Sequence, residues 1–298
     1  MELRELRAFI AVVEEGGMSA AARRLHVSQS ALSQTVSGLE RQLGLKLLTR
    51  TNTGVRPTRE GEALLVEGRA LVARHDQALR TMAGFLSPGC GLLRVGIPLE
   101  LPSELLRPAV EYVTATCPDT RVDARHLSSA AQLEALRAGD LDVGLLRERP
   151  VDEDLDAILV VRENLGVLLT ANAAAERSDE DAVRLEALRG LEWVGFPRSG
   201  SPAWYDEVTS VLRSHGLNAG PEPPEGQALI AEVKLAAVAT EKAFALAPPN
   251  WSQPLPDNVV WKPLHGHPLV RRTWASWPAQ SRRRDLASFI AGLPFVDA

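Results

Sequence analysis

Apolar residues within the first ninety positions recur at helical spacing. Between Ser28 and Gly44 they follow steps of three and four, which predicts a helix whose buried stripe is Leu32, Val36, Leu39 and Leu43. Ser28 has the side chain of an N-cap, and Gly44 suits a left-handed C-cap. A shorter helix is predicted to begin at an N-cap, Ser19, and to close at Leu25. The two helices, separated by residues 26–28, predict a helix-turn-helix.

The polar face of the second predicted helix carries amides and hydroxyls and few charges. Its members are Gln29, Ser30, Ser33, Gln34 and Ser37. Such side chains both donate and accept hydrogen bonds, which is what a helix needs to recognise base edges in a major groove. We therefore expect this face to contact DNA.

The segment after Gly44 predicts a small hairpin followed by a long helix. Residues 45–57 form a strand, a turn that contains Gly54, and a return strand, which together predict a wing. Thr58 is the expected N-cap of a helix that ends before residues 87–89. A small domain cannot bury the apolar residues of so long a helix, so we expect it to pair with its copy in a second subunit. These residues are Leu64, Leu65, Leu71, Val72, Leu79, Met82 and Leu86.

From residue 89 onward, strands and helices are predicted to alternate. The predicted strands cover residues 92–97, 122–127, 141–146, 164–169, 193–196, 244–247 and 270–277, and the predicted helices cover 105–116, 128–138, 202–215, 227–239 and 281–291. This order favours a parallel α/β sheet. The glycines around Cys90 precede a strand and lack the spacing of a nucleotide-binding loop, so they predict a hinge.

Charge is divided unevenly along the chain. The 298 residues have a formal net charge of -5, with 45% hydrophobic and 24% charged residues. Between residues 19 and 58, however, six bases stand against the single acid Glu40, a local balance of +5: Arg23, Arg24, Arg41, Lys46, Arg50 and Arg56. A charge cluster alone is usually a solvated surface, but this one coincides with the helix-turn-helix pattern. A basic module on an acidic body is typical of a regulator with a separate sensing domain.

Several other classes of protein are disfavoured by the sequence. No apolar run is long enough to cross a bilayer, and charged residues interrupt the start as no secretory signal would, so we expect a cytoplasmic protein without a membrane partner. Cys90 and Cys117 could pair, although two cytosolic thiols are more often simply reduced. Neither His265 nor His267 has nearby carboxylates, so loop residues are favoured over a metal site. The motifs of hydrolases, metalloproteases and phosphate-binding loops do not occur, and we expect no enzyme and no cofactor.

The N-terminal motifs resemble those of the LysR-type transcriptional regulators. The matching residues are Leu6-x-x-Phe9, Ser19-Ala20-Ala21-Ala22-x-x-Leu25, Val27-Ser28-Gln29-Ser30-Ala31-Leu32-Ser33, Leu39-Glu40, Leu43-Gly44, Arg50, Pro57-Thr58 and Gly61. The match is strong over the first eighty residues and looser over the rest, where it concerns element order and short motifs.

The resemblance implies three parts and two kinds of partner. It implies a winged helix-turn-helix at residues 1–58, a dimerising linker helix at 59–88, and an α/β effector domain at 89–298 shaped like the periplasmic solute-binding proteins. The first lobe of that domain would contain residues 89–161 and 265–298, and the second lobe residues 162–264. The partners implied are double-stranded DNA, a small-molecule effector in the cleft, and further copies in a homodimer or homotetramer. The expected DNA-contacting residues are Arg23, Ser28, Gln29, Ser30, Ser33, Gln34, Ser37, Thr53 and Arg56.

Candidate effector contacts lie where predicted strands end and helices begin, because amides at helix N-termini attract anions. They are Glu100, Ser103, Ser128, Ser129, Arg147, Pro197, Arg198, Ser199, Ser201 and Pro202. Each serine could equally be a helix cap. Arg147 could clamp a carboxylate or belong to a solvated cluster with Glu148 and Arg149. Relatives that sense aromatic-pathway acids resemble the chain at Arg147 and at residues 196–202, which favours an organic acid.

The chain departs from the family pattern at four places. Leu48 replaces the usual Phe, and Asn52 and Thr53 replace wing arginines, which should weaken contacts of the wing with phosphates. Residues 240–242 replace a glycine-rich turn. Glu100 would repel an anion unless Arg147 or Arg198 neutralised it. A rival hypothesis is a DNA-binding protein whose C-terminal domain only oligomerises; titration of metabolites against thermal stability separates the two.

Overall fold

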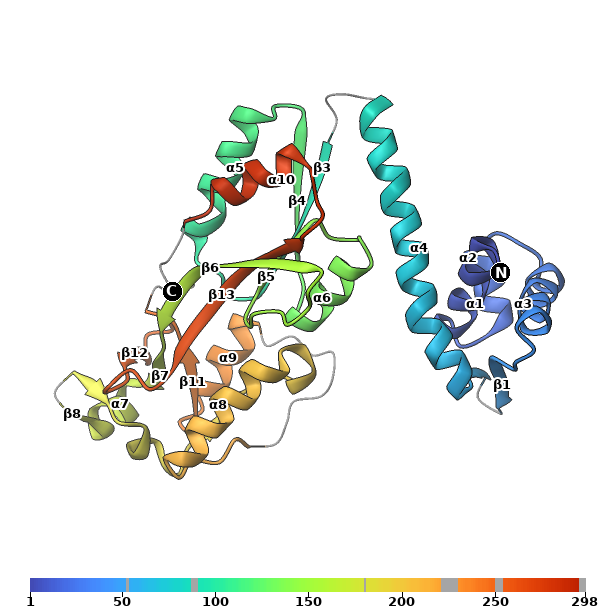
Figure 1. Ribbon diagram of the computed structural model, residues 1–298. Helices are drawn as coiled ribbons and strands as arrows, with labels where there is room; N and C mark the ends of the chain where they lie inside the picture. Colours follow the sequence, from blue (N-terminus) through green and yellow to red (C-terminus); the bar gives the residue numbers. More distant parts are fainter. Residues whose placement is uncertain (52–53, 87–90, 180, 221–229, 250–253, 295–298) are drawn as a thin grey trace. The chain divides into compact units, whose positions relative to one another are not determined.

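The computed structural model describes residues 1–51, 54–86, 91–179, 181–220, 230–249 and 254–294 (Figure 1). The chain divides into an N-terminal unit that ends with the long helix α4 and a C-terminal unit that begins with strand β3. The two units are described separately below. Thr53, Cys90 and the start of the helix expected at residue 227 lie outside the described residues.

The N-terminal unit is a winged helix-turn-helix followed by one long helix. Its elements are α1 (Leu3–Glu14), α2 (Met18–Arg24), α3 (Gln29–Leu43), the hairpin strands β1 (Leu48–Thr51) and β2 (Gly54–Pro57), and α4 (Arg59–Leu86). Ala11, Ala21, Leu32 and Val36 meet in the core between the first three helices. This packing presents the opposite face of α3 to solvent.

The predicted caps of α3 and α4 are confirmed. The Ser28 hydroxyl accepts a hydrogen bond from the Ala31 backbone N–H at 3.2 Å, and Gly44 adopts the left-handed conformation with φ 68°. Thr58 accepts from the Gly61 N–H at 3.0 Å and donates to the Lys46 carbonyl at 2.7 Å, which ties the start of α4 to the base of the wing.

Two predictions in this unit are wrong. Gly17, and not Ser19, is the N-cap of α2; the Ser19 hydroxyl instead donates to Gln29 Oε1 at 3.1 Å. Leu43 does not complete the buried stripe of α3, because the last turn extends beyond the core and leaves this side chain 37% exposed. Along α4, Leu71, Leu79 and Met82 are about half exposed.

The first lobe of the C-terminal unit is built on a five-stranded sheet in the order β4-β3-β5-β13-β6. Its strands are β3 (Gly91–Ile97), β4 (Thr120–His126), β5 (Val143–Leu146), β6 (Leu155–Asn164) and β13 (Val270–Pro278). Helices α5 (Ser103–Thr116) and α10 (Arg284–Ala291) pack on the face that carries Leu93 and Val95. Alternation along β3 turns Gly96 to the other face, where α6 (Ser129–Arg137) approaches so closely that a Cβ on Gly96 would lie 2.7 Å from Gln132 Oε1.

The second lobe is built on a four-stranded sheet in the order β10-β11-β7-β12. Its strands are β7 (Gly166–Thr170), β10 (Glu192–Trp193), β11 (Ala243–Ala247) and β12 (Val259–Pro263). Val167 and Phe244 pack with helix α8 (Pro202–Ser214), and Leu168 and Ala245 pack with helix α9 (Ala231–Val238). The remaining elements are α7 (Ala171–Arg177), the short pair β8 (Ser178–Asp179) and β9 (Ala182–Val183), and the 3-10 turns η1 (Leu185–Leu188) and η2 (Arg198–Gly200).

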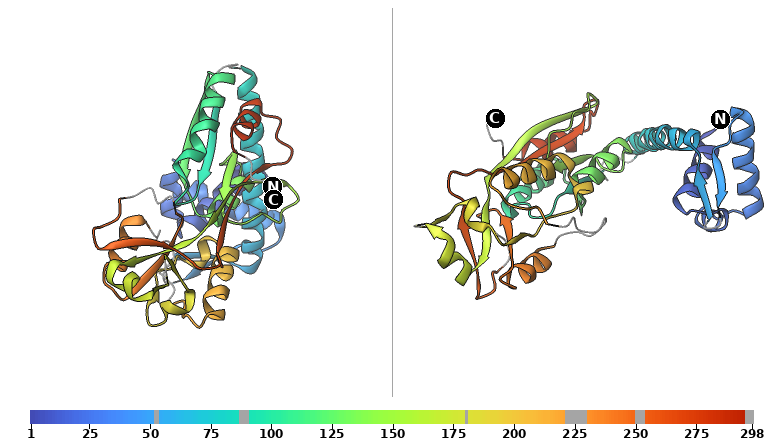
Figure 2. Two further views of the ribbon diagram at one scale, coloured as in Figure 1. Left: turned by 90° about the vertical axis from the view of Figure 1, so that its left-hand side faces the viewer. Right: turned by 90° about the horizontal axis from the view of Figure 1, so that it is seen from below.

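Both sheets are mixed, which corrects the prediction of a parallel sheet. Only the β4-β3-β5 and β10-β11 pairings are parallel, whereas β13 runs antiparallel to β5 and β6. The prediction missed β6 and β12. Strand β6 pairs with β13 over its whole length, and both views of Figure 2 keep the two strands side by side. The chain therefore passes from the first lobe to the second at Leu165 and returns between Leu264 and Leu269.

Candidate functional site

The exposed face of α3 begins at its N-terminal turn. Gln29, Ser30, Gln34 and Ser37 are exposed there, and Ser33 is half-buried. Gln29 is oriented by the hydroxyl of Ser19, which reaches it from α2. The Ser28 hydroxyl accepts from the backbone of α3 and also lies 3.1 Å from the hydroxyl of Ser30.

Two of the predicted cations flank this face. Arg23 in the last turn of α2 and Arg56 on β2 are both exposed. Figure 1 shows α3 and the hairpin strand β1 within the same small unit. Amides and hydroxyls on a helix beside exposed arginines can contact base edges and phosphates respectively.

Glu40 fixes the base of the wing to the end of α3. Its Oε1 accepts from the backbone N–H groups of Leu47 (2.9 Å) and Leu48 (3.3 Å), and its Oε2 pairs with Lys46 at 2.7 Å. Burial acts to raise the pKa of Glu40, but the hydrogen bonds from Lys46 and the two amides outweigh it and hold that pKa below its usual range. This role of Glu40 was not predicted from the sequence, where the residue stood out as the single acid of a basic segment and as part of the Leu39-Glu40 motif.

A cavity of about 480 Å³ lies in the C-terminal unit and is lined by residues of both lobes. The first lobe contributes the segments that follow β3, β4 and β5, and the second contributes η2, α8, α9 and β11. One wall is aromatic. Trp193, Phe196 and Trp204 line it, and Trp193 and Phe196 meet edge to face with ring centroids 5.9 Å apart. Such a wall suits an apolar or aromatic body.

The lining also carries three buried cations, Arg147, Lys234 and Arg271. Glu100 lies among them. Its carboxylate accepts from Lys234 Nζ and, at 2.9 Å, from Arg271 Nη1; Arg271 also pairs with Glu163 of β6 at 3.0 Å. Arg147 donates to Thr273 Oγ1 at 2.6 Å and to the carbonyls of Leu99 and Glu100.

Burial and mutual repulsion perturb these cations. Burial lowers the pKa of Lys234, and the charges of Arg271 and Arg147 act in the same direction, while Glu100 opposes the change. The pKa of Arg147 is lowered too, first by burial and then by Arg271. For Glu100, burial acts to raise the pKa, but Lys234 and Arg271 outweigh it and the pKa is lowered.

The predicted serines occupy two different roles. Ser128 lines the cavity and caps α6 by accepting from the Ala131 N–H at 3.3 Å. Ser129 is buried in the lining and accepts from the Arg147 backbone N–H at 3.0 Å. In the second lobe, Pro197, Ser199 and Ser201 also line the cavity.

Two of the predicted effector residues, Arg198 and Pro202, are not part of the cavity lining in the described structure. Arg198 points its guanidinium at Asp206, with bonds of 2.8 and 2.7 Å, and this hydrogen bonding lowers the pKa of that carboxyl. Ser103 begins α5 and Pro202 begins α8. The sequence offered Arg147 and Arg198 as cations that could neutralise Glu100; the cations that pair with its carboxylate are Lys234 and Arg271.

Lys234 and Arg271 were missed by the sequence analysis. Lys234 is the one cation of α9 and is flanked by Val233 and the apolar residues 235–238, a position that demands a buried partner and could have signalled the site. Arg271 sits in a strand beside another arginine and gave no such signal. The turn at residues 240–242 lies outside the lining, and its Glu241 adopts a left-handed φ of 66° in a turn where the family has glycine.

A second carboxylate also connects the two lobes. Glu148, which follows β5, accepts from the backbone N–H groups of Ala203 (3.1 Å) and Trp204 (3.3 Å) in the first turn of α8. It supplies the side-chain cap that Ser201 does not provide. Arg147 and Glu148 are therefore not members of a solvated cluster, whereas Arg149 is exposed.

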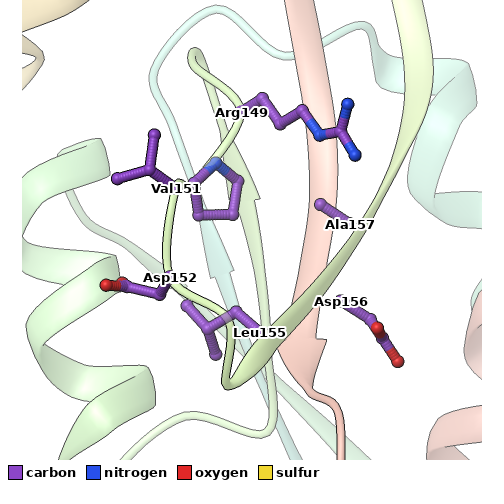
Figure 3. Close-up of a pocket in the computed structure, with 7 residues that line it drawn as sticks. Arg149, Val151, Asp152, Leu155, Asp156 and Ala157 are labelled. Carbon is purple, nitrogen blue, oxygen red and sulfur yellow. The ribbon is translucent and has the colours of Figure 1, made fainter.

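A further pocket lies on the loop between β5 and β6. It is lined by residues 149–152 and 155–157, and Figure 3 shows that these residues follow one loop and the beginning of one strand. Arg149 extends over the neighbouring strand to the ring of Trp274, 5.5 Å from its centroid. This pocket includes no residue of the second lobe and none of the predicted effector contacts.

Metal sites, membrane spans and thiols can be assessed for the part of the chain that the structure describes. No group of three or more His, Cys, Asp and Glu side chains there is placed to hold a metal ion. Within the same residues, no helix combines the length and apolarity needed to span a bilayer. Cys117 has a reduced, half-buried thiol.

A winged helix-turn-helix unit and a two-lobed unit with a cavity define the class of DNA-binding transcriptional regulators with an effector domain. The chain belongs to the LysR family of these regulators. The model of the bacterial regulatory helix-turn-helix proteins of the lysR family matches residues 3–62, and the model of the LysR substrate binding domain matches residues 87–293.

Individual relatives agree with this assignment. The HTH-type transcriptional regulator ClcR of Pseudomonas putida is 36% identical over 215 residues, which cover 72% of each chain. The crystal structure of CbnR, a LysR family transcriptional regulator, superimposes with a TM-score of 0.68 at 25% identity over 98% of both chains. Full-length CbnR complexed with its target DNA gives a TM-score of 0.67 at 25% identity, covering 98% of this chain and 99% of that one.

Proposed function

We propose that the chain is a sequence-specific, effector-responsive regulator with its tasks divided along the sequence. Residues 1–58 bind double-stranded DNA, residues 59–88 join subunits into a homodimer or homotetramer, and residues 89–298 bind the effector. The amide-rich face of α3 supports the assignment of DNA binding. The exposed apolar side chains of α4 support the assignment of subunit contacts. CbnR, a relative in structure, has been crystallised with its target DNA.

The proposed effector is a small organic acid with an apolar or aromatic body. The observation that carries this proposal is the pairing of an aromatic wall with buried cations in one cavity. Arg147, Lys234 and Arg271 contribute three positive charges, and Glu100 and Glu163 contribute two negative ones, so the cluster has one positive charge in excess. This excess positive charge attracts a monoanion into the cavity.

A screen of acids tests the effector hypothesis. All six tryptophans lie between residues 193 and 277, and Trp193 and Trp204 line the cavity, so intrinsic fluorescence reports on the C-terminal unit alone. We expect an aromatic or aliphatic monocarboxylate to change this fluorescence, to raise the melting temperature of the full chain and to change its affinity for operator DNA.

The rival function gives a different result. If the C-terminal domain only oligomerises, no acid shifts the melting temperature, while DNA binding and oligomer size remain. Neutral amides of the same acids are the matched controls, because they retain the shape and lack the charge.

A further inference from the structure

The turn that follows β3 holds Glu100 rigidly inside the cavity. Glu100 adopts a left-handed backbone conformation with φ 57°. Its carbonyl accepts hydrogen bonds from Arg147 and Arg271, each at 3.0 Å. The main chain is thus fixed by two buried guanidinium groups, and the carboxylate is directed at Lys234 and Arg271.

Each carboxylate oxygen of Glu100 takes one cation. Oε1 pairs with Lys234 Nζ of the second lobe, and Oε2 pairs with Arg271 Nη1 at the start of β13. The side chains of the two cations are only 6% exposed and that of Glu100 is 15% exposed. The pair with Lys234 joins the two lobes.

Glu100, Lys234 and Arg271 all line the cavity, whereas Glu163 does not. The place where two buried cations would receive the carboxylate of a ligand is therefore already taken by a carboxylate of the protein. We propose that Glu100 is a built-in competitor of the effector: an incoming carboxylate displaces it from Lys234 and Arg271 and so breaks its ion pair with Lys234, which joins the two lobes alongside the pair of Arg272 with Glu207.

This inference rests on the proposed acid effector and adds a mechanism to it. Once Glu100 leaves, the incoming carboxylate restores both charge-assisted hydrogen bonds, so Lys234 and Arg271 remain paired throughout. The apolar body of the ligand then lies toward Trp193, Phe196 and Trp204. The direct ion pair between Glu100 of the first lobe and Lys234 of the second is replaced by one that runs through the ligand.

Two variants of the full chain with the same change of charge test the proposal. Glu100→Gly removes the competing carboxylate at a position whose positive φ suits glycine. Glu163→Gln also removes a carboxylate beside Arg271, but one outside the cavity lining. The probes are benzoate and its neutral analogue benzamide, titrated by calorimetry.

We expect Glu100→Gly to bind benzoate about tenfold more tightly than the wild type, and benzamide with little change, because a site that holds two charged donors gains most from a charged acceptor. Glu163→Gln should gain much less. In the Glu100→Gly background, Lys234→Gln should remove most of the gain. An unchanged or weaker benzoate affinity in Glu100→Gly, or an equal gain in Glu163→Gln, would overturn the proposal.

A second measurement applies if Glu100→Gly is less stable than the wild type. Benzoate should then raise its melting temperature more than that of the wild type, because it replaces the missing carboxylate; the absence of this rescue would overturn the proposal. The test is separate from that of the effector. If the wild type binds an acid and Glu100→Gly binds it no better, only displacement fails and the acid effector stands; if the wild type binds no acid but Glu100→Gly binds benzoate, the acid effector and the displacement both fail, and Glu100 simply blocks the site.

Discussion

Gln29 and Gln34 present their amides on the exposed face of α3, where a bidentate contact with adenine is possible. We expect Gln29→Ala and Gln34→Ala each to lower the discrimination between operator and random DNA by about 1–3 kcal/mol. The measurement is the ratio of the two affinities at one salt concentration. Gln42→Ala, the same change at an exposed position in the last turn of α3 and outside the expected DNA contacts, is the matched control. If both glutamine variants keep the wild-type ratio, another face of the unit contacts the bases.

The role of Arg147 shows where residue-level prediction from sequence ends. Its type and its place after β5 were enough to assign it to the cavity, and it does line the cavity. Its guanidinium, however, donates to Thr273 and to two carbonyls, partners more than forty residues away in the chain. Arg198 has the same residue type at a similar strand end but pairs with Asp206. Residue type predicts a chemical capability, and only the fold decides which partner uses it.

At the scale of elements, Glu40 connects the end of α3 to the wing through two amides and Lys46. We expect Glu40→Gln to destabilise the N-terminal unit by about 1–3 kcal/mol, because a buried, charged acceptor is lost. Circular dichroism should detect this change, whereas tryptophan fluorescence, which reports on the C-terminal unit, should not. Lys46→Gln is the control: its side chain is 81% exposed, and its loss should cost less than about 1 kcal/mol.

The stability difference between the wild type and Glu40→Gln should also depend on pH. Because the folded-state pKa of Glu40 lies below the ordinary value of 4.5, its stabilisation is complete above that value and is lost as the pH falls through the folded-state pKa. The difference in stability between the wild type and Glu40→Gln should therefore be constant near neutral pH and shrink below pH 4.5. A difference that persists unchanged into stronger acid would contradict the assignment.

Elements with strong local signals were predicted well. Periodicity and caps gave α3 and α4, since their stabilising groups lie within a few residues of one another. The missed strand β6 includes the apolar residues 157–161, but it follows a loop that lacks glycine and joins the sheet only by pairing with β13, more than a hundred residues later. Mixed sheet topology could not be deduced for the same reason, because strand direction depends on pairing between distant segments.

At the scale of the whole chain, residues 19–58 carry a net positive charge although the net charge of the full sequence is negative. We expect the affinity for any duplex to fall linearly with the logarithm of salt concentration, and Arg56→Gln to reduce the slope by about one while weakening operator and random DNA alike. Arg107→Gln removes an equally exposed charge from α5 in the C-terminal unit and should leave the slope unchanged. Equal slopes for the wild type and Arg56→Gln would exclude Arg56 from the phosphate contacts.

The two passages of the chain between the lobes lie side by side. The Leu165 N–H donates to the Leu269 carbonyl at 2.9 Å, so both passages are fastened at one point. They form a hinge between the lobes. Away from this hinge, Glu100 and Glu148 of the first lobe contact the second lobe at Lys234 and at the first turn of α8. A rotation about the hinge displaces each contact between the lobes in proportion to the distance of that contact from the hinge. A small ligand that replaces contacts between the lobes can therefore change the angle between them without altering the fold of either lobe.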